Sequence, residues 1–473
     1  MKRKQIAIIG GGGAGAAAAW SLSTVHDVNL FEAENSLGGH AYSELLEVDG
    51  KIIPVDMGVE YFSEKTAPNL FALHRKLKIE TFVAPLAFSA YFPKEKSYWT
   101  NGSCTGSLWK ELRDEFDKFH IQMHEVMHKG DLSVKRQTLG EFLEENKYSD
   151  KFINKGLLPL MTSFSSCRSP LLEYSLTLSS LSFSMGLLSF FHPTYWRKSC
   201  VGINGYLKII EKELGTRVHT NSPVEKVKRS DKGVSIFFKD GKVRDFDEVI
   251  FATHADITLS LLETPTPEEK NILGGFKYSQ IKAVLHTDKN VLPEIPCKRT
   301  YLEYIGLDEV QSPENGVGGS LNRILNHLDV HTDLNTPIIV TYDPITTIKE
   351  SHIIKEQNWK IPNLRPKDML RKLEIRKIQG KLNTWFCGTD TVYTGHEGAI
   401  LSGLAIADAL GAAYPFENDD WAKIQFGVVK GLMGVYSNSE KLNDLFGKVV
   451  HKTARLLGLH KSQISRVLLD MYA

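Results

Sequence analysis

A glycine-rich turn close to the N-terminus constrains the fold of this chain more than any other feature. The segment QIAIIGGGGAGAAAAW has an apolar run at residues 6–9, which Gly10, Gly12 and Gly15 follow in the spacing G-x-G-x-x-G. A buried parallel strand, a tight turn and a helix are expected in that order. The first glycine permits the turn, the second lets a pyrophosphate approach the backbone, and the third allows the helix to pack closely on the strand. The segment therefore predicts a dinucleotide-binding site.

The same stretch, with the basic residues before it, also resembles a secretory signal peptide. The residues that follow favour the cofactor site. Val28, Leu30 and Phe31 form a second predicted strand, and Glu32 ends it. An acid about twenty residues past the first glycine is placed to accept hydrogen bonds from the ribose hydroxyls of an adenosine. We therefore expect a dinucleotide cofactor and a cytoplasmic location.

Composition excludes several other classes of protein. The chain has 473 residues, enough for two or three domains, and a formal net charge of +1, and it contains no motif that reads nucleic acid. Its five cysteines are scattered without the paired spacing of a zinc site or a redox couple, so no metal is expected. No run of eighteen or more apolar residues occurs, which argues against a membrane-spanning helix.

A second glycine pair narrows the choice among dinucleotide cofactors. Glu32 followed by Leu37-Gly38-Gly39 resembles flavoproteins of the monoamine oxidase and phytoene desaturase superfamily, in which the second pair contacts the FAD diphosphate. That family usually has arginines flanking these glycines, whereas this chain has Ser36 and His40. The segment that begins at Asp56 extends the resemblance to an amine-oxidase-like branch linked to unsaturated fatty-acid modification. The resemblance implies FAD as the cofactor.

Two later blocks complete the resemblance. In SPVEKVKR, Val224 stands where the family's backbone contacts adenine, and a buried strand ends at Ala252. In CGTDTVYTGHEGAI, Asp390 takes the position of an acid that binds the ribitol or diphosphate region, and a helix opens at residues 397–399. The N-terminal dipole of that helix would face the flavin pyrimidine. The implied cofactor-binding residues are Gly10, Gly12, Gly13, Ala14, Gly15, Glu32, Ala33, Gly38, Gly39, His40, Val224, Ala252, Thr253, Gly388, Thr389, Asp390, Glu397, Gly398 and Ala399.

The predicted fold class is α/β. A Rossmann-like FAD-binding domain of the monoamine-oxidase type is expected from residues 1–81, 201–254 and 382–415. An interleaved α+β substrate domain is expected from residues 82–200 and 255–381, because these segments lack glycine-motif character. Residues 416–473 are predicted to form a helical C-terminal segment.

Three residues are candidates for catalysis. Lys282 in YSQIKAVLHTD resembles the amine-oxidase lysine that hydrogen-bonds through water to the reactive flavin nitrogen. A solvent-facing strand lysine is the alternative. His286 lies on the same predicted strand face and is a secondary candidate, although a lone histidine is more often structural. Tyr393 stands in the region where amine oxidases place one aromatic ring of a substrate cage, but the motif matches only in part.

The substrate is predicted from an apolar segment. Pro170–Phe191 alternates large apolar residues with serines, which suits the wall of an elongated apolar tunnel or, alternatively, plain core packing. We expect hydride removal from an unsaturated fatty-acyl or polyene-like substrate, giving desaturation or double-bond isomerisation. Amine oxidation to an imine is the first alternative. A non-catalytic lipid-binding protein on the same fold, resembling Rab escort and dissociation-inhibitor proteins, is the second.

The C-terminal region carries a basic amphipathic pattern. LFGKVVHKTARLLGLHKSQISRVLLDMY, within residues 421–473, has apolar residues at helical spacing and an excess of lysine and arginine. Such a helix is suited to peripheral contact with an anionic membrane, or to packing on the protein body as an ordinary surface helix.

Overall fold

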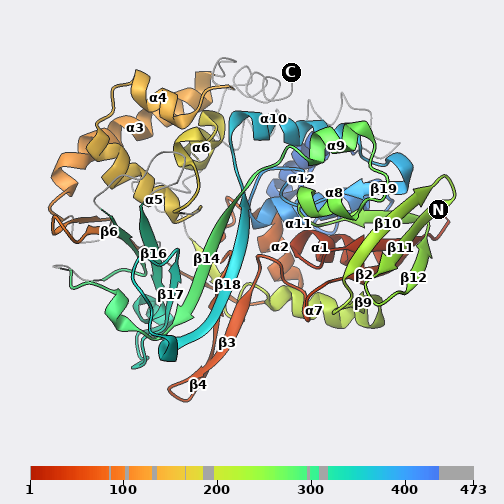
Figure 1. Cartoon of the computed structure of the whole chain (residues 1–473), viewed down its shortest axis with the longest axis horizontal. Coiled ribbons are helices and arrows are strands. Elements are labelled where there is room, and N and C mark those ends of the chain that lie inside the picture. The colour runs from red at the N-terminus through yellow and green to blue at the C-terminus, as the bar shows by residue number, and fades with distance from the viewer. Residues whose placement is uncertain are drawn as a thin grey trace.

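The fold is that of a computed structural model, which describes residues 2–84, 87–101, 106–129, 136–165, 167–184, 196–295, 299–307 and 318–435. Figure 1 shows two lobes, one built on a five-stranded sheet and the other on a seven-stranded sheet. We call them the five-stranded lobe and the seven-stranded lobe. Strands β14 and β18 run between the two.

The five-stranded sheet is entirely parallel. Its order is β19–β13–β1–β2–β9, which brings together strands from three separate parts of the sequence. The strands are β1 (Gln5–Ile9), β2 (Asp27–Phe31), β9 (Val218–His219), β13 (Glu248–Phe251) and β19 (Thr384–Phe386). Strand β1 is central and almost wholly apolar because parallel strands are covered on both faces.

Helices cover one face of this sheet. They are α1 (Gly13–Leu22), α2 (Pro68–Lys76), α7 (Gly205–Leu214), α11 (His396–Ala409) and α12 (Asp420–Met433). The small residues of α1 and α11 allow the two helices to approach closely. A Cβ at Gly403 would overlap the Ala14 carbonyl oxygen, so only glycine fits there.

The other face carries a three-stranded antiparallel sheet and two helices. The strands are β10 (Val224–Ser230), β11 (Gly233–Phe238) and β12 (Val243–Phe246), and the helices are α8 (Ala255–Leu261) and α9 (Pro267–Leu273). Ile272, Leu273 and Ile375 share one apolar cluster with Ile9 and Phe251 of the central sheet. Both ends of the segment 255–381 therefore pack on the five-stranded sheet, although the sequence prediction groups that segment with the substrate domain.

The seven-stranded lobe has a mixed sheet of order β18–β14–β17–β16–β15–β6–β7, in which only the β15–β6 pair is parallel. The strands are β6 (Phe88–Phe92), β7 (Ser97–Thr100), β14 (Tyr278–His286), β15 (Leu302–Gly306), β16 (Gly319–Ile324), β17 (Ile339–Tyr342) and β18 (Ile353–Pro362). The helices of this lobe are α3 (Trp109–Lys129), α4 (Leu139–Glu145), α5 (Leu158–Thr162) and α6 (Leu176–Ser184). They pack on one sheet face around the largest apolar cluster.

Smaller elements join the lobes. They are β3 (Ser43–Val48), β4 (Lys51–Asp56), β5 (Thr81–Val83), β8 (Arg197–Ser199) and α10 (Pro366–Glu374). Strand β4 leaves the five-stranded lobe and buries Ile53 and Val55 in the apolar cluster of the seven-stranded lobe.

Two predictions from the sequence extend beyond the described residues. The apolar segment that begins at Pro170 continues as a 3₁₀ turn and α6, and residues 185–191 lie outside the described part. The predicted amphipathic helix falls within residues 436–473, which also lie outside it. Within the described ranges, no helix is long and apolar enough to cross a membrane.

Candidate functional site

The glycine turn between β1 and α1 is shaped by close backbone contacts. A Cβ at Gly15 would overlap the Gly10 carbonyl oxygen, so the helix approaches the strand as closely as a glycine allows. Gly10 has φ +104°, a value that L side chains rarely adopt. Its amide donates to the Phe31 carbonyl (2.9 Å) and so ties the turn to the end of β2. Ala252 lies against the same turn, because its amide donates to the Ile9 carbonyl (2.8 Å).

Gly12 is different from Gly15. A Cβ there would meet only the Gly38 carbonyl oxygen and Gly39 Cα, both at 3.9 Å, which is ordinary contact. Gly12 has φ −74° and stands at the N-cap of α1, where the first amides of the helix and its positive dipole end favour an anion. The fold itself therefore does not require glycine at position 12, but a pyrophosphate that approaches this backbone does.

The second glycine pair lies directly against the first turn. Gly12 and Gly38 form an isolated parallel bridge, and the Gly38 amide donates to the Gly11 carbonyl (3.1 Å). Gly39 has φ +55°. The structure thus brings the two predicted glycine motifs together as one cradle without side chains.

Glu32 stands at the end of β2, beside this cradle. Its carboxylate accepts hydrogen bonds from the amide of Gly11 (2.6 Å) and from the amide of Glu34 (2.9 Å). Ala33 follows it as an exposed residue. The Ser222 amide donates to the Glu32 carbonyl (2.8 Å), which brings the entry to β10, and with it Val224, to the same corner. The structure thus brings Glu32 and Val224 to one corner, and their contacts with an adenosine stay a prediction.

Asp390 of the third block lies against the segment that follows β13. The Asp390 Oδ2 accepts from the Ala255 amide (2.9 Å) and the Tyr278 hydroxyl (2.7 Å), and lies 3.4 Å from His254 Nδ1. Its Oδ1 is buried and has no hydrogen-bond partner among the described residues. Burial raises the pKa of Asp390, but the interactions with His254, Lys372 and Tyr278 outweigh it and lower that pKa overall. A buried carboxylate oxygen without a partner is suited to accept a hydrogen bond from a ligand hydroxyl.

Backbone features leave room beside Asp390. Gly388 and Gly395 both have φ +109°, and a Cβ on either would meet nothing within 4 Å. The Thr389 carbonyl accepts a hydrogen bond from Lys372 Nζ (2.5 Å), a buried lysine whose pKa is lowered to about 8, chiefly by burial. The sequence prediction missed Lys372 because it lies on α10, outside every glycine motif.

Glu397 has a different environment from the one predicted. Its Oε1 accepts from the amide and the side chain of Asn69 (both 2.8 Å), and its Oε2 accepts from the Leu70 amide (2.8 Å). These groups belong to the first turn of α2, so Glu397 caps that helix and joins it to α11. Burial raises the pKa of Glu397 to about 7. Its neighbours Gly398 and Ala399 lie in the first turn of α11, and a Cβ at Gly398 would overlap the Tyr393 carbonyl oxygen.

A family model for flavin containing amine oxidoreductases matches residues 14–302, more than half of the 473 residues. The chain belongs to this family. It is therefore an FAD-dependent oxidoreductase, which confirms the predicted α/β fold, the cofactor and the enzyme class. The non-catalytic lipid-binding alternative is set aside. Among curated proteins, none matches the sequence.

Several solved structures share the fold. A putrescine oxidase variant with redesigned cofactor binding has a TM-score of 0.64 and 13% identity, over 87% of this chain and 99% of that one. A fatty acid isomerase from P. acnes that produces CLA has a TM-score of 0.61 and 16% identity, over 87% and 99%. Cyclohexylamine oxidase from Brevibacterium oxydans IH-35A has a TM-score of 0.63 and 13% identity, over 86% and 100%.

The residues present fit FAD. The cradle of Gly12, Gly38 and Gly39 leaves the backbone open to a diphosphate, and Glu32 stands at the predicted ribose end. Within the described ranges, Asp390 Oδ1 has no hydrogen-bond partner. When bound, FAD supplies the hydride-accepting chemistry. The protein groups contribute binding, orientation and charge.

The three catalytic candidates are not brought to one place. Lys282 Nζ forms an ion pair with Glu356 Oε1 of β18 (2.7 Å), and both side chains are 43% exposed. Lys282 lies on the face of β14 opposite to Ile281 and Ala283, which pack in the large apolar cluster. Its role beside the flavin stays a prediction.

His286 is enclosed within the seven-stranded lobe. Its Nδ1 accepts from the Asp288 amide (3.1 Å), so the proton lies on Nε2, which donates to Thr341 Oγ1 (2.7 Å). Burial lowers its pKa to about 4. Within the described chain, its hydrogen-bond partners are Thr341 and Asp288, and neither belongs to a glycine motif. Tyr393 points toward α12, where its hydroxyl donates to Gln425 Oε1 (3.3 Å).

A buried charged cluster next to the site was not predicted. Glu60 Oε2 accepts from Lys198 Nζ (2.5 Å) and the Tyr301 hydroxyl (2.5 Å), while Arg323 Nε lies 2.9 Å from Glu60 Oε1. Arg323 also donates to the Gly58 carbonyl (2.9 Å). Asp56 completes the cluster, 3.5 Å from Lys198. Asp56 and Glu60 are close in sequence, but Lys198, Tyr301 and Arg323 lie far from them, so no local motif marks the cluster.

Replacing Glu32 tests the adenosine end. Glu32→Ala removes the predicted ribose acceptor and two hydrogen bonds that hold the turn. A hydrogen bond to a charged group contributes about 1.5–3 kcal/mol. The FAD dissociation constant should rise at least about tenfold, because 1.4 kcal/mol corresponds to that factor. Isothermal titration of the apoprotein with FAD measures it. Unchanged affinity would make Glu32 a strand-end acid without a cofactor role. Glu34→Ala, at an exposed neighbour, is the matched control.

Proposed function

We propose that this enzyme removes a hydride from a neutral, hydrophobic substrate such as an unsaturated fatty-acyl chain, giving desaturation or, if the hydride returns at another carbon, isomerisation of a double bond. The observation that supports this most is that the buried carboxylates near the site already have partners within the protein. Asp56 and Glu60 are paired with Lys198 and Arg323, and Glu397 caps α2.

A protonated amine needs a receiver for its charge. Stranding an ammonium in a buried site costs several kcal/mol unless a carboxylate or aromatic cage accepts it. Asp390 is held through Oδ2 by Tyr278 and Ala255, and we assign its remaining oxygen to the cofactor. Tyr393 points toward α12, and Gly395 at the entry to α11 contributes no side chain.

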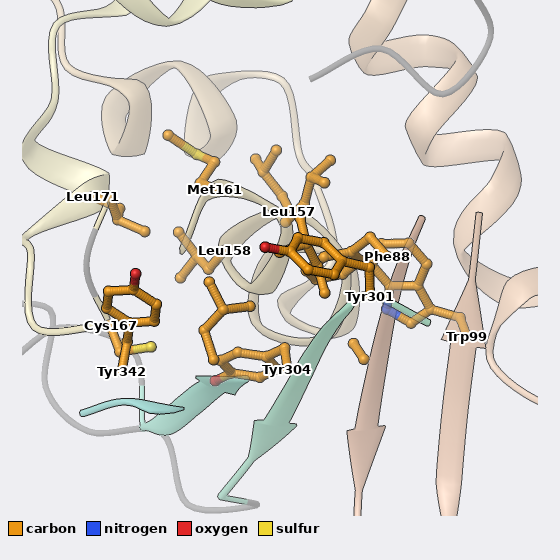
Figure 2. Packing of buried hydrophobic residues seen from close by; sticks show 14 of the residues in the cluster. Phe88, Trp99, Leu157, Leu158, Met161, Cys167, Leu171, Tyr301, Tyr304 and Tyr342 are labelled. Atoms are coloured by element: carbon orange, nitrogen blue, oxygen red, sulfur yellow. The ribbon is translucent and has the colours of Figure 1, made fainter. Parts of the chain in front are cut away.

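The seven-stranded lobe offers an apolar environment instead. Figure 2 shows Leu158, Met161 and Leu171 from the helical layer facing Tyr304 and Tyr342 of the sheet. Dispersion and apolar burial suit a hydrocarbon chain in such surroundings better than a small dication. The shared fold of a fatty acid isomerase is compatible with this proposal.

Amine oxidation is the second candidate. The family of the chain favours it, and putrescine and cyclohexylamine oxidases share its fold. Under this proposal Lys282 would act near the flavin after leaving Glu356, with which it is paired in the structure.

Anaerobic mixing distinguishes the two. The FAD-loaded enzyme is mixed without oxygen with a panel of unsaturated fatty acids and, separately, with putrescine and cyclohexylamine. Flavin absorbance is followed, and products are identified by mass spectrometry. The proposal predicts bleaching by a fatty acid, or double-bond migration at constant mass without net bleaching. Bleaching by amines alone would contradict it.

We also propose that residues 436–473 mediate peripheral contact with anionic membranes, because their sequence is basic and amphipathic. Deletion should begin after Val435, since α12 buries Val429 and Met433 in the core and must be kept. Cosedimentation with anionic vesicles should fall on deletion, and it should fall for the full chain as salt is raised. Equal cosedimentation of the full chain and the deleted chain would indicate that residues 436–473 do not bind the membrane and pack on the protein body instead.

A further inference from the structure

His40 occupies a special place in the cradle. It directly follows Gly39, and its carbonyl accepts a hydrogen bond from the Val59 amide (3.0 Å). A Cβ at Gly58 would overlap the same carbonyl oxygen, so the main chain at His40 is held on this side by neighbouring backbone. The half-buried ring lies against Trp359 of β18 (centroid distance 5.1 Å) and His254 (5.7 Å).

In the part of the chain that the structure describes, no hydrogen bond joins a ring nitrogen of His40 to another residue. Within the described chain, the hydrogen bonds of His40 involve its backbone, whereas the rings of the neighbouring His254 and His396 bond to Asp390 and Tyr206. A half-buried imidazole with two unused nitrogens, next to a glycine cradle at a helix N-terminus, is suited to donate to an anionic ligand.

The surroundings keep His40 neutral in the apoprotein. Burial and, to a smaller extent, the nearby His254 lower the pKa of His40 to about 4, although Asp390 acts in the opposite direction. His396 of α11 also faces this region, and burial, His74 and His40 lower its pKa to about 3. Trp359, the contact from β18, carries no charge. The cradle thus presents an uncharged imidazole to an anionic ligand. An arginine at this position would be charged at all times, whereas His40 must first bind a proton.

We propose that His40 takes up a proton when FAD binds, so that an imidazolium faces the cofactor diphosphate in the holoprotein. The proton comes from solvent and binds the free imidazole nitrogen, and no other bond changes. The inference rests on FAD binding and is independent of the proposed substrate.

The sign of the pH dependence follows from linkage. The negative diphosphate favours the charged imidazole, so the pKa of His40 is higher in the holoprotein than in the apoprotein. Between those two pKa values, only the bound state carries the proton, and FAD affinity therefore falls as pH rises. The dependence ends below about pH 4, where the imidazole is charged in both states.

Titration calorimetry of the apoprotein with FAD tests this without any substrate. The FAD dissociation constant should rise with pH between about pH 5 and 8, by at most about tenfold per unit, the limit for one coupled proton. Titrations in two buffers of different ionisation enthalpy should show net proton uptake in the same range. A wild-type protein that binds FAD with no proton uptake across this range would overturn the proposal.

Variants identify the titrating group. His40→Arg should bind FAD tightly with little pH dependence, because its charge is permanent. His40→Gln should bind FAD more weakly than the wild type near pH 5 and should show no proton uptake on binding. His352→Gln, a histidine of the seven-stranded lobe that bonds to Thr287 and lies outside the cofactor site, is the matched control and should behave as wild type. Retention of the wild-type pH dependence in His40→Gln would assign the proton to another group, such as His254, and overturn the role of His40. If His40→Gln does not fold, the wild-type and His40→Arg titrations still decide the question.

Discussion

Gly15→Ala is expected to give a protein that no longer retains FAD and is less stable by about 1–3 kcal/mol or more, the usual cost of overpacking a well-packed interior. The added methyl group would overlap the Gly10 carbonyl oxygen and contact Ala252, so either the helix or the strand must move. Gly10 belongs to the turn that is predicted to face the diphosphate, and Ala252 lies against it. A displaced turn loses the aligned amides of α1. Urea unfolding of the apoprotein and flavin content after gel filtration measure the two effects.

Gly12→Ala provides the contrast within the same motif. Its methyl group would meet neighbouring atoms only at 3.9 Å, and φ at this position is already −74°. The apoprotein should therefore unfold at nearly the wild-type urea concentration. FAD affinity should nevertheless fall by roughly 100-fold, or about 3 kcal/mol, because the methyl group stands where the pyrophosphate approaches. Wild-type FAD affinity in Gly12→Ala would contradict the placement of the cofactor on this turn.

Lys198→Met is expected to destabilise the protein by about 3–5 kcal/mol, because it leaves Glu60 and Asp56 buried with one cation fewer. Burial acts to lower the pKa of Lys198, but Glu60 and Asp56 raise it above its ordinary value, so the lysine is charged in the folded state. The Met57–Val59 backbone that Arg323 holds lies against His40, so weaker FAD binding should accompany the loss of stability.

A surface pair is the control for this prediction. Lys151 Nζ lies 2.6 Å from Glu111 Oε2 with both side chains about half exposed, and Lys151→Met should cost no more than about 1 kcal/mol. Urea unfolding of the two variants measures the difference. Equal stability of Lys198→Met and Lys151→Met would show that the cluster at Glu60 does not carry the stability assigned to it.

The sequence predicts the cofactor cradle well because its determinants are local. The spacing of Gly10, Gly12 and Gly15 encodes a strand, a turn and a helix, and a glycine pair after Glu32 marks a second approach to the same phosphate group. The structure brings both motifs into contact and adds the segments at Ala252 and Asp390, as expected from their order along the chain.

Non-local contacts explain what could not be predicted. The Lys198–Glu60 hydrogen bond joins residues 138 apart, and the Asn69–Glu397 contact joins residues 328 apart. A local motif assigns Glu397 to the cofactor, whereas both of its oxygens bond to α2. Alternation along β14 predicts the face on which Lys282 lies, but its partner Glu356 depends on the pairing of β14 with β18.

The most direct test of the account is the flavin content of the purified protein. The chain is incubated with excess FAD, passed through gel filtration to remove free cofactor, and examined by visible absorption. The open glycine turn at Gly12, the carboxylate of Glu32 beside it and the available oxygen of Asp390 predict that flavin absorption elutes with the protein in equimolar amount, and that Gly12→Ala elutes without it. A folded wild-type protein that remains colourless after this treatment would contradict the account.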